Sequence, residues 1–389
     1  MISYSETAVQ SVLESKRSYC KFLSANDSGA TGAHQAGILI SKSALEMMFN
    51  KNVLNEHTSK RIVRIKWQDD ITTESCFTWY GSKNELRITR LGRGFPYRRP
   101  DMTGALFVFT QQEDDVYHGY VLETEDEIDY FLNFFGITPV ETNRPIRIKE
   151  TEPEVCEATV IQEFIADLTV DFPDSFEMSQ AARFIDDLVR NHTEYVKSDP
   201  DTKLLNWTET EYTLFRALEY TRYSNIIQQG FPSVEEFVIL ANQVLNRRKS
   251  RAGKSLEHHL AAIFDANALL YSAQAKTEGH KRPDFIFPSE KAYHTASFPE
   301  DRLIVLAAKT TCKDRWRQIL NEADRLKNKT KYLCTLQPGI SADQLTEMKA
   351  EGVQLVVPKQ YIPAYPPEKQ SDIWTLKTFI EYVKELETL

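Results

Sequence analysis

The sequence contains no apolar run that approaches the roughly 18 residues needed for a membrane-spanning helix, and its first residues lack the apolar core of a signal peptide. Internal repeats and low-complexity tracts are also missing. The five cysteines are far apart and show no metal-binding spacing: Cys20, Cys76, Cys156, Cys312 and Cys334. These absences exclude a membrane span and a cysteine metal site, and they lead us to expect a cytoplasmic protein with reduced thiols.

The sequence also has no excess of positive charge. The chain has 47 Lys and Arg against 56 Asp and Glu, a net charge of −9. Any contact with nucleic acid must therefore come from local basic patches. A length of 389 residues is too great for one ordinary core, so the sequence predicts two domains.

The first half, to about Ile148, contains short runs of strand-forming residues separated by Gly, Asn and Asp. The runs cover residues 36–41, 61–67, 77–82, 86–92, 105–111 and 117–123. This pattern predicts a barrel-like all-β unit with a helix or two.

Two other stretches of the first half stand out. Residues 24–37, SANDSGATGAHQAG, are small and polar and predict a loop, for which composition alone favours a plain glycine-rich connection. Residues 82–99 carry many cations and a single acid, Glu85. Such a cationic stripe suits phosphates and guanine edges, although charge alone is equally compatible with a solvated strand face. The cations are Lys83, Arg87, Arg90, Arg93, Arg98 and Arg99.

An acidic, weakly patterned stretch, residues 149–164, is predicted to connect this unit to a second domain, residues 165–389. That domain begins with helices and continues as alternating strands and helices, which predicts a mixed α/β unit. Ser233 and Glu236 occupy capping-box positions of one helix. Gly253 is expected to end that helix, and a new one is expected near Ser255.

Around this predicted break lies a second basic cluster that contains no acid. It consists of Arg247, Arg248, Lys249, Arg251 and Lys254. Glu257 falls in the first turn of the next helix, where an acid ordinarily only favours the helix dipole. His258 and His259 are expected at the surface.

The segment with the clearest chemistry starts at Lys309, directly after the apolar strand 303–308. Asp284 opens another short apolar strand, 25 residues earlier. An aspartate and a lysine at the ends of adjacent strands can share a divalent metal and a scissile phosphate. This is the pattern of a PD…(D/E)xK nuclease site, except that Ala307 stands where the second acid is usual. Glu322, expected one to two turns into the helix that follows, can supply the missing carboxylate.

A dense group of charges follows the lysine: Lys313, Asp314, Arg315 and Arg317, with Trp316 among them. Arginine can pair with guanine O6 and N7, and aspartate can accept a hydrogen bond from cytosine N4. The segment therefore has the chemistry of base recognition.

Several segments together resemble the EcoRII-like type II restriction endonucleases over nearly the full length. The first half contributes residues 24–37, NELRITRLGRG (84–94) and MTGAL (102–106). The second half contributes residues 246–260, RPDFIFPS (282–289), AYH (292–294) and KTTCKDRWRQILNEAD (309–324). The last of these is too long and chemically unusual for coincidence.

The resemblance implies an N-terminal effector-DNA-binding pseudobarrel, like that of plant transcription factors, joined to a restriction-endonuclease-like mixed sheet flanked by helices. It implies a Mg²⁺-dependent homodimer that cuts double-stranded DNA at a pseudopalindromic CCWGG- or CCNGG-like site and leaves 5′-phosphates. It also implies autoinhibition by the N-terminal domain, activation by a second site, and a cognate DNA methyltransferase as a genetic partner.

The resemblance assigns roles where the residues match. Asp284, Lys309 and Glu322 become the catalytic set, with Asp284 and Glu322 as metal ligands and Glu257 and Tyr293 as further active-site residues. Lys313, Asp314 and Arg315 match the base-reading segment, and the basic residues Arg247, Arg248, Lys249, Arg251 and Arg317 are expected on the DNA backbone. The residues matched to effector DNA are His34, Lys83, Glu85, Arg87, Arg90 and Arg93, although Leu86 stands where the family has a basic residue.

Two other functions remain open at this stage. A DNA-binding regulator with a decayed nuclease domain would have no reason to keep Asp284, Lys309 and Glu322 together. A repair or structure-specific nuclease would have little use for a base-reading segment, since such enzymes mostly contact the backbone.

Overall fold

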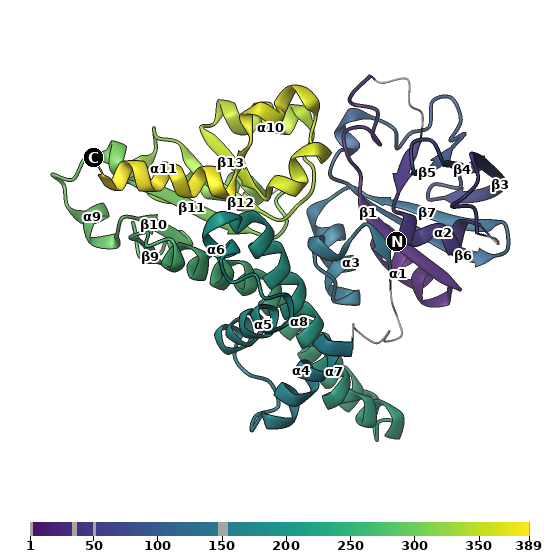
Figure 1. The fold of residues 1–389 in the computed structure, drawn as a ribbon, viewed down its shortest axis with the longest axis horizontal. Coiled ribbons are helices and arrows are strands. Elements are labelled where there is room, and N and C mark those ends of the chain that lie inside the picture. The colour runs from purple at the N-terminus through teal and green to yellow at the C-terminus, as the bar shows by residue number, and fades with distance from the viewer. Residues whose placement is uncertain (1–2, 33–36, 50–51, 147–154, 314, 389) are drawn as a thin grey trace.

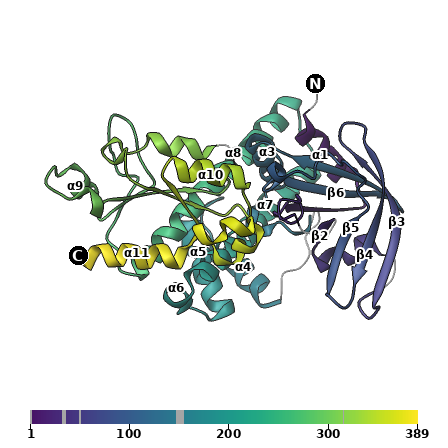
Figure 2. The same ribbon diagram turned by 90° about the horizontal axis from the view of Figure 1, so that it is seen from above.

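Two β-sheets, one in each half of the chain, organise the computed structural model, with a group of long helices beside them (Figures 1 and 2). The structure describes residues 3–32, 37–49, 52–146, 155–313 and 315–388. None of the helices in these ranges is both long and apolar enough to cross a membrane.

The N-terminal sheet has eight strands in the order β2-β5-β4-β3-β7-β6-β1-β8. Strands β3 and β7 pair in parallel, and the other neighbours are antiparallel. The strands are β1 (Arg17–Phe22), β2 (Ile38–Ile40), β3 (Thr58–Trp67), β4 (Thr72–Tyr80), β5 (Glu85–Thr89), β6 (Leu106–Glu113), β7 (Val116–Leu122) and β8 (Arg144–Pro145). All six predicted strands of the first half are therefore confirmed.

Strands β1, β6 and β7 of this sheet bury side chains on both faces, because they alternate side chains between two clusters. Trp67, Phe77 and Phe109 belong to an aromatic core on the inside of the curved sheet. Residues such as Phe22 and Val108 face the other way, onto two helices. These helices are α1 (Tyr4–Glu14) and α3 (Glu125–Phe135), and a short α2 (Leu45–Met48) lies elsewhere in the domain. The prediction of an all-β unit with a helix or two is confirmed.

The predicted connector is helical over its second part. Residues 147–154 lie outside the described ranges, and α4 (Val155–Asp167) follows them. Ile161 and Ile165 of α4 are buried against the next helices, which explains why this part is structured. These helices are α5 (Ser175–Arg190), α6 (Tyr195–Ser198), α7 (Pro200–Gln229) and α8 (Val234–Ala266).

Helix α8 is continuous through Gly253, so the predicted break there is wrong. A glycine in a helix interior costs only about 1 kcal/mol relative to alanine, and the buried residues Arg251, Ser255 and Leu256 anchor both sides of it. Glu257 consequently lies in the middle of a helix and not in a first turn. His259 is fully buried, contrary to the expected surface position.

The C-terminal sheet has six strands in the order β14-β13-β12-β11-β10-β9. Strands β11 to β14 are parallel, and β10 and β9 are antiparallel to their neighbours. The strands are β9 (Ser272–Ala273), β10 (Phe285–Phe287), β11 (Ile304–Lys309), β12 (Lys331–Thr335), β13 (Val353–Val357) and β14 (Trp374–Thr375). The sheet is sandwiched between α8 and α11 (Leu376–Thr388) on one face and α9 (Glu290–His294) and α10 (Ala342–Ala350) on the other. The predicted mixed α/β domain is confirmed.

The segment after Lys309 departs from the expected α-helix. It forms two short 3₁₀ helices, Arg315–Asn321 and Asp324–Leu326, separated by Glu322 and Ala323. In a 3₁₀ helix residues three apart lie on the same side, so Trp316 and Ile319 are both buried. Glu322 therefore lies at the break between the two short helices.

Candidate active site

Asp284 and Lys309 meet where β10 begins and β11 ends, at the edge of the C-terminal sheet that is formed by the carboxyl ends of its parallel strands. Asp284 directly precedes β10, Lys309 ends β11, and the antiparallel register places Phe285 opposite Leu306. Asp284 is buried, and its Oδ2 accepts hydrogen bonds from the Ala308 amide at 2.8 Å and from Lys309 Nζ at 3.4 Å. The structure thus brings the predicted aspartate and lysine together.

Glu257 reaches the same edge from helix α8. Its Oε2 accepts a hydrogen bond from Gln274 Nε2 at 2.8 Å, and the same amide donates to Asp284 Oδ1 at 2.9 Å. Burial, and then the charge of Asp284, raise the pKa of Glu257. The sequence interpretation missed Gln274 as a neighbour of the candidate site, because a single glutamine in a loop has no recognisable pattern.

Glu322 is the third carboxylate near this edge. Burial, and then the charge of Asp284, raise the pKa of Glu322 to about 7, whereas Lys309 and Lys331 lower it. Its Oε2 atom is buried and has no hydrogen-bond partner among the described residues. The small side chain of Ala307 shares a core with Ile319, which lets the segment that carries Glu322 pack against β11. The replacement of the usual second acid by alanine is thus compatible with a carboxylate supplied from elsewhere.

Asp284 contacts Lys309 directly, and the carboxylates of Glu257 and Glu322 lie close enough for the charges of Asp284 and Lys309 to affect their pKa values. Carboxylate oxygens are the ligands that Mg²⁺ prefers, and the unpartnered oxygen of Glu322 is available to a cation. Within the described ranges, no three or more His, Cys, Asp or Glu side chains are already arranged to hold a metal ion. The amide of Gln274 lies between two of the carboxylates, so it must move if a cation is to use both.

Tyr293, in α9, is buried, and its hydroxyl points to Glu278. The hydroxyl donates to Glu278 Oε1 at 2.5 Å and accepts a hydrogen bond from the Arg325 amide at 3.2 Å. These contacts connect Tyr293 to the turn that follows Glu322.

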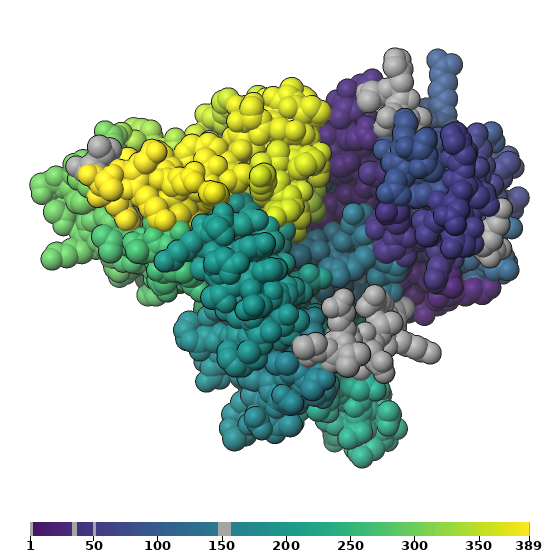
Figure 3. All heavy atoms as spheres, viewed as in Figure 1, coloured from purple at the N-terminus to yellow at the C-terminus, as the bar shows by residue number. Residues whose placement is uncertain are grey.

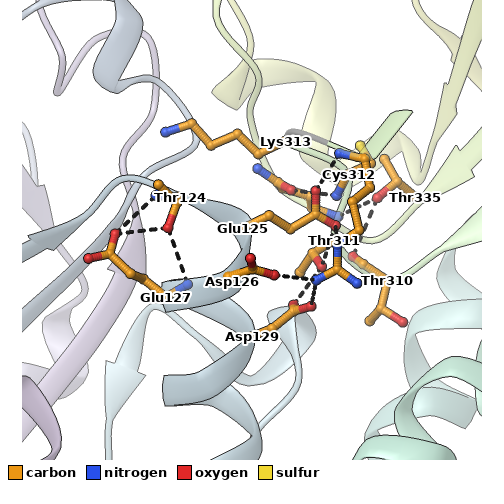
Figure 4. Close-up of polar contacts among 12 residues, drawn as sticks. Thr124, Glu125, Asp126, Glu127, Asp129, Thr310, Thr311, Cys312, Lys313 and Thr335 are labelled. Carbon is orange, nitrogen blue, oxygen red and sulfur yellow. Dashed lines mark hydrogen bonds and ion pairs between the residues drawn. The ribbon is translucent and has the colours of Figure 1, made fainter. Parts of the chain in front are cut away.

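The segment after Lys309 lies against the N-terminal domain, where it meets the first turns of α3 (Figure 4). Arg315 donates from its backbone amide to Glu125 Oε2 at 2.8 Å and from its guanidinium to Asp129 Oδ2 at 2.5 Å. Thr311 Oγ1 donates to Asp129 Oδ1 at 2.7 Å. Although burial acts against its charge, these acids raise the pKa of Arg315. The predicted base-reading arginine is therefore occupied by acids of the other domain.

The structure describes two of the three charged residues next to Arg315, Lys313 and Arg317. Lys313 is buried, and its carbonyl oxygen accepts a hydrogen bond from Gln344 Nε2 at 2.8 Å. Asp314 lies outside the described residues. Arg317 is exposed and forms an ion pair with Glu347.

Of the five residues expected on the DNA backbone, two are exposed and three have aromatic or acidic partners within the protein. Lys249 is exposed, like Arg317. Arg247 lies over the Phe172 ring, with its guanidinium carbon 3.9 Å from the ring centroid, and Arg248 pairs with Glu219 at 2.8 Å. Arg251 is buried near Glu211, at 3.7 Å. In this structure these three guanidinium groups have protein partners, so contact with phosphates would require those interactions to open.

The cationic stripe of the N-terminal domain follows β5 and the turns at its two ends. Lys83, Arg90 and Arg93 are exposed. Arg87 is buried and pairs with Glu85 at 2.9 Å. His34 lies outside the described residues.

A six-stranded mixed sheet with helices on both faces and an Asp–Lys pair at its edge defines a nuclease domain of the restriction-endonuclease class. The comparisons with known proteins give the particular family. Residues 13–152 match the family described as restriction endonuclease EcoRII, N-terminal, and residues 215–380 match EcoRII C terminal. The chain is 39% identical to the type II restriction enzyme EcoRII of Escherichia coli over 384 residues, which are 93% of this chain and 92% of that protein. The chain belongs to the EcoRII family and is a type II restriction endonuclease.

Two solved structures also resemble it. Metal-depleted Ecl18kI in complex with uncleaved, modified DNA has 16% identity and a TM-score of 0.46, over 61% of this chain and 86% of that one. A restriction endonuclease PspGI–substrate DNA complex has 16% identity and a TM-score of 0.45, over 56% of this chain and 94% of that one.

Proposed function

We propose that this endonuclease uses Mg²⁺ to hydrolyse double-stranded DNA at a short pseudopalindromic CCWGG- or CCNGG-like site and leaves 5′-phosphates. The observation that carries the proposal is the grouping of Asp284, Lys309 and Glu322, in which a buried Glu322 oxygen lacks a partner among the described residues. An unpaired buried carboxylate costs stability, and a vestigial nuclease domain would gain nothing from keeping it.

Asp284 and Glu322 would hold the metal, which when bound supplies Lewis-acid stabilisation of the phosphate. Lys309 contributes a positive charge beside the reacting phosphate. Glu257 is a helper carboxylate whose raised pKa suits proton transfer. We assign Tyr293 a supporting role, because its hydroxyl contacts Glu278 and the Arg325 amide.

The chemistry is tested by three substitutions. Asp284→Asn, Lys309→Ala and Glu322→Ala should each reduce cleavage by at least roughly 100-fold, because each removes a few kcal/mol of transition-state stabilisation. Specific DNA binding, measured in Ca²⁺, should largely remain. The measurement is cleavage of plasmid DNA of known sequence with the ends mapped, which also identifies the recognition site. Cleavage by Glu322→Ala at the parental rate in Mg²⁺ would overturn this assignment.

Sequence recognition is proposed for Lys313, Asp314 and Arg315, in line with the base-pairing chemistry of Asp and Arg. Phosphate contacts are proposed for the basic residues of α8 and for Arg317. Of these, Lys249 is exposed and so is available without rearrangement.

Autoinhibition is supported by the position of α3. Glu125 and Asp129 engage Arg315, and Thr311, two residues after Lys309, is bound by the same two acids. Acids that occupy a DNA-reading arginine compete with DNA for it. Separation of the domains would release Arg315 for a base contact.

Activation by a second site requires that the N-terminal domain bind DNA while docked. Lys83, Arg90 and Arg93 are exposed in the docked arrangement, and strands β3 to β5 lie at the end of the molecule remote from the C-terminal domain (Figures 1 and 2). Effector DNA can therefore reach this surface first. It opens the enzyme only to the extent that it binds the open state more tightly.

A homodimer is supported by the α7–α8 hairpin, whose end projects from the molecule (Figure 3). Its surface is unusually apolar: Ile227 is 63% exposed, Val234 72% and Ile239 58%. Tyr220, Ile226, Phe237, Val238 and Leu245 of the same hairpin are also exposed. Large exposed apolar patches mark interaction sites, and two chains would supply two active sites for the two DNA strands. A cognate DNA methyltransferase in the same cytoplasm is proposed as the genetic partner that protects host DNA.

A further inference from the structure

The turn that carries Glu322 has an unfavourable backbone conformation. Ala323 adopts φ +57°, in the left-handed region that residues with a side chain rarely occupy. Ala323 is also fully buried, in a core with Tyr293 and Leu326. Such conformations persist only where the surrounding structure enforces them.

Glu278 holds the turn on the C-terminal side of Glu322. Its carboxylate accepts hydrogen bonds from the Asp324 amide at 2.9 Å and the Arg325 amide at 3.2 Å. Tyr293 donates to the same carboxylate and contacts the Arg325 amide. Burial alone would raise the pKa of Glu278, but these hydrogen bonds outweigh it and lower the pKa, so the carboxylate stays ionised.

Lys331 holds the turn on the other side. Lys331 is 3% exposed, and its Nζ donates to the carbonyl oxygens of Leu320 at 2.5 Å and of Glu322 itself at 2.6 Å. A buried ammonium needs such partners, and here it uses two backbone carbonyls of the catalytic turn.

Both anchors are tied to the strands that carry the other active-site residues. Lys331 opens β12, which pairs with β11 and places Lys309 opposite Thr335. Glu278 lies in the loop between β9 and β10, which ends at Asp284. The backbone on either side of Glu322 is therefore fixed relative to Asp284 and Lys309.

We propose that Glu278 and Lys331 are positioning residues that hold the strained turn at Ala323 and thereby place the Glu322 carboxylate for the metal. The proposal rests on the role of Glu322 as a metal ligand. Neither residue touches the metal or the substrate; each acts through the backbone of the turn. Partners that orient metal ligands typically contribute roughly 10–100-fold to metal affinity.

The test measures Mn²⁺ binding to the full-length protein by electron paramagnetic resonance, which counts the free ion. Mn²⁺ is bound by carboxylate oxygens, and the readout does not depend on cleavage. The variants are Glu278→Gln, which keeps the shape of the side chain, and Lys331→Met, which keeps its length. Lys281→Met is the matched control, because Lys281 forms an ion pair with the Asp324 side chain of the same turn, which is 53% exposed. Glu322→Ala tests the ligand role separately.

We expect Glu278→Gln and Lys331→Met to raise the Mn²⁺ dissociation constant by roughly 10–100-fold, while Lys281→Met stays within about twofold. Cleavage by the two variants should recover at high Mg²⁺, because the ligand is displaced and not removed. Parental Mn²⁺ affinity in Glu278→Gln, with affinity lost in Glu322→Ala, would overturn the positioning roles. Parental affinity in Glu322→Ala itself would instead overturn the proposed ligand. Circular dichroism and thermal unfolding establish that each variant is folded, and if Lys331→Met is not, Glu278→Gln decides.

Discussion

At the scale of single residues, Glu322 combines burial, a negatively charged neighbour and an oxygen without a partner among the described residues. Its pKa of about 7 lies above the value of an ordinary glutamate, about 4.3. The folded protein thus holds this proton more tightly than the unfolded chain. Protonation of Glu322 therefore stabilises the folded protein. This stabilisation is fully present below the pKa that Glu322 has in the unfolded chain, and it is lost as the pH rises through about 7.

Glu322→Gln should therefore stabilise the metal-free protein at pH 8, by about 1–3 kcal/mol, because a neutral amide replaces a buried charge. The gain should shrink as the pH is lowered toward about 5, where the parental carboxyl is itself protonated. Thermal unfolding of both proteins in EDTA across this range measures the effect. Added Mg²⁺ should stabilise the parent more than the variant. Parallel pH profiles for the two proteins would contradict the raised pKa.

Sequence reasoning located Asp284 and Lys309 because each follows or opens a short apolar strand with a recognisable spacing. It expected Glu322 near these two residues, and in the structure the charges of Asp284 and Lys309 both affect its pKa. It also expected a regular helix there, since the left-handed conformation of Ala323 has no signature in the sequence. Gln274, Glu278 and Lys331 were not identified, because their importance depends on contacts that only the folded chain creates.

At the scale of elements, the regular strands and most helices followed from residue patterns, and the exceptions have physical causes. Gly253 does not end α8, because buried residues on both sides stabilise a continuous helix. Residues 155–164 form a helix despite their weak pattern, because Ile161 and Ile165 pack against neighbouring helices. In both cases tertiary packing outweighs local propensity.

Helix α3 gives a direct test of autoinhibition. Replacement of Glu125 by Gln together with Asp129 by Asn removes two charges that hold Arg315. Because a hydrogen bond to a charged group contributes about 1.5–3 kcal/mol, the double variant should cleave one-site DNA at least roughly 10-fold faster than the parent. Its stimulation by a second site should shrink accordingly. Rates on one-site and two-site plasmids measure both effects.

Asp126→Asn is the matched control, since Asp126 lies in the same turn and carries the same charge but is 96% exposed and 3.4 Å from Arg315. Exposed pairs of this kind contribute little, so its rates should stay within about twofold of the parent. If the double variant kept the parental rates on both plasmids, α3 would have no inhibitory role.

At the scale of the whole molecule, the docked domains leave two surfaces available, and they differ in chemistry. The exposed cations of the N-terminal domain suit DNA, whereas the projecting α7–α8 hairpin is apolar and suits protein. This division could not be predicted from the sequence, because the apolar residues of the hairpin follow the same helical pattern as residues that pack inside a domain. Only the structure shows that these residues are exposed when the described parts of the chain are folded together.

The hairpin therefore carries the last prediction. Ile227→Asp and Val234→Asp should each convert the dimer to a monomer at micromolar concentration, because a charge that is harmless on an exposed surface becomes costly in a dry interface. Sedimentation velocity measures the mass. Ile62→Asp is the control, since Ile62 is equally exposed at 61% but lies on β3 of the N-terminal domain. A monomer has one active site, so its residual activity should be nicking, seen as open-circle plasmid, in place of cleavage of both strands.

A parental protein that is itself monomeric would overturn the homodimer. Hairpin variants that remain dimeric would place the interface elsewhere and leave the apolar surface to another partner.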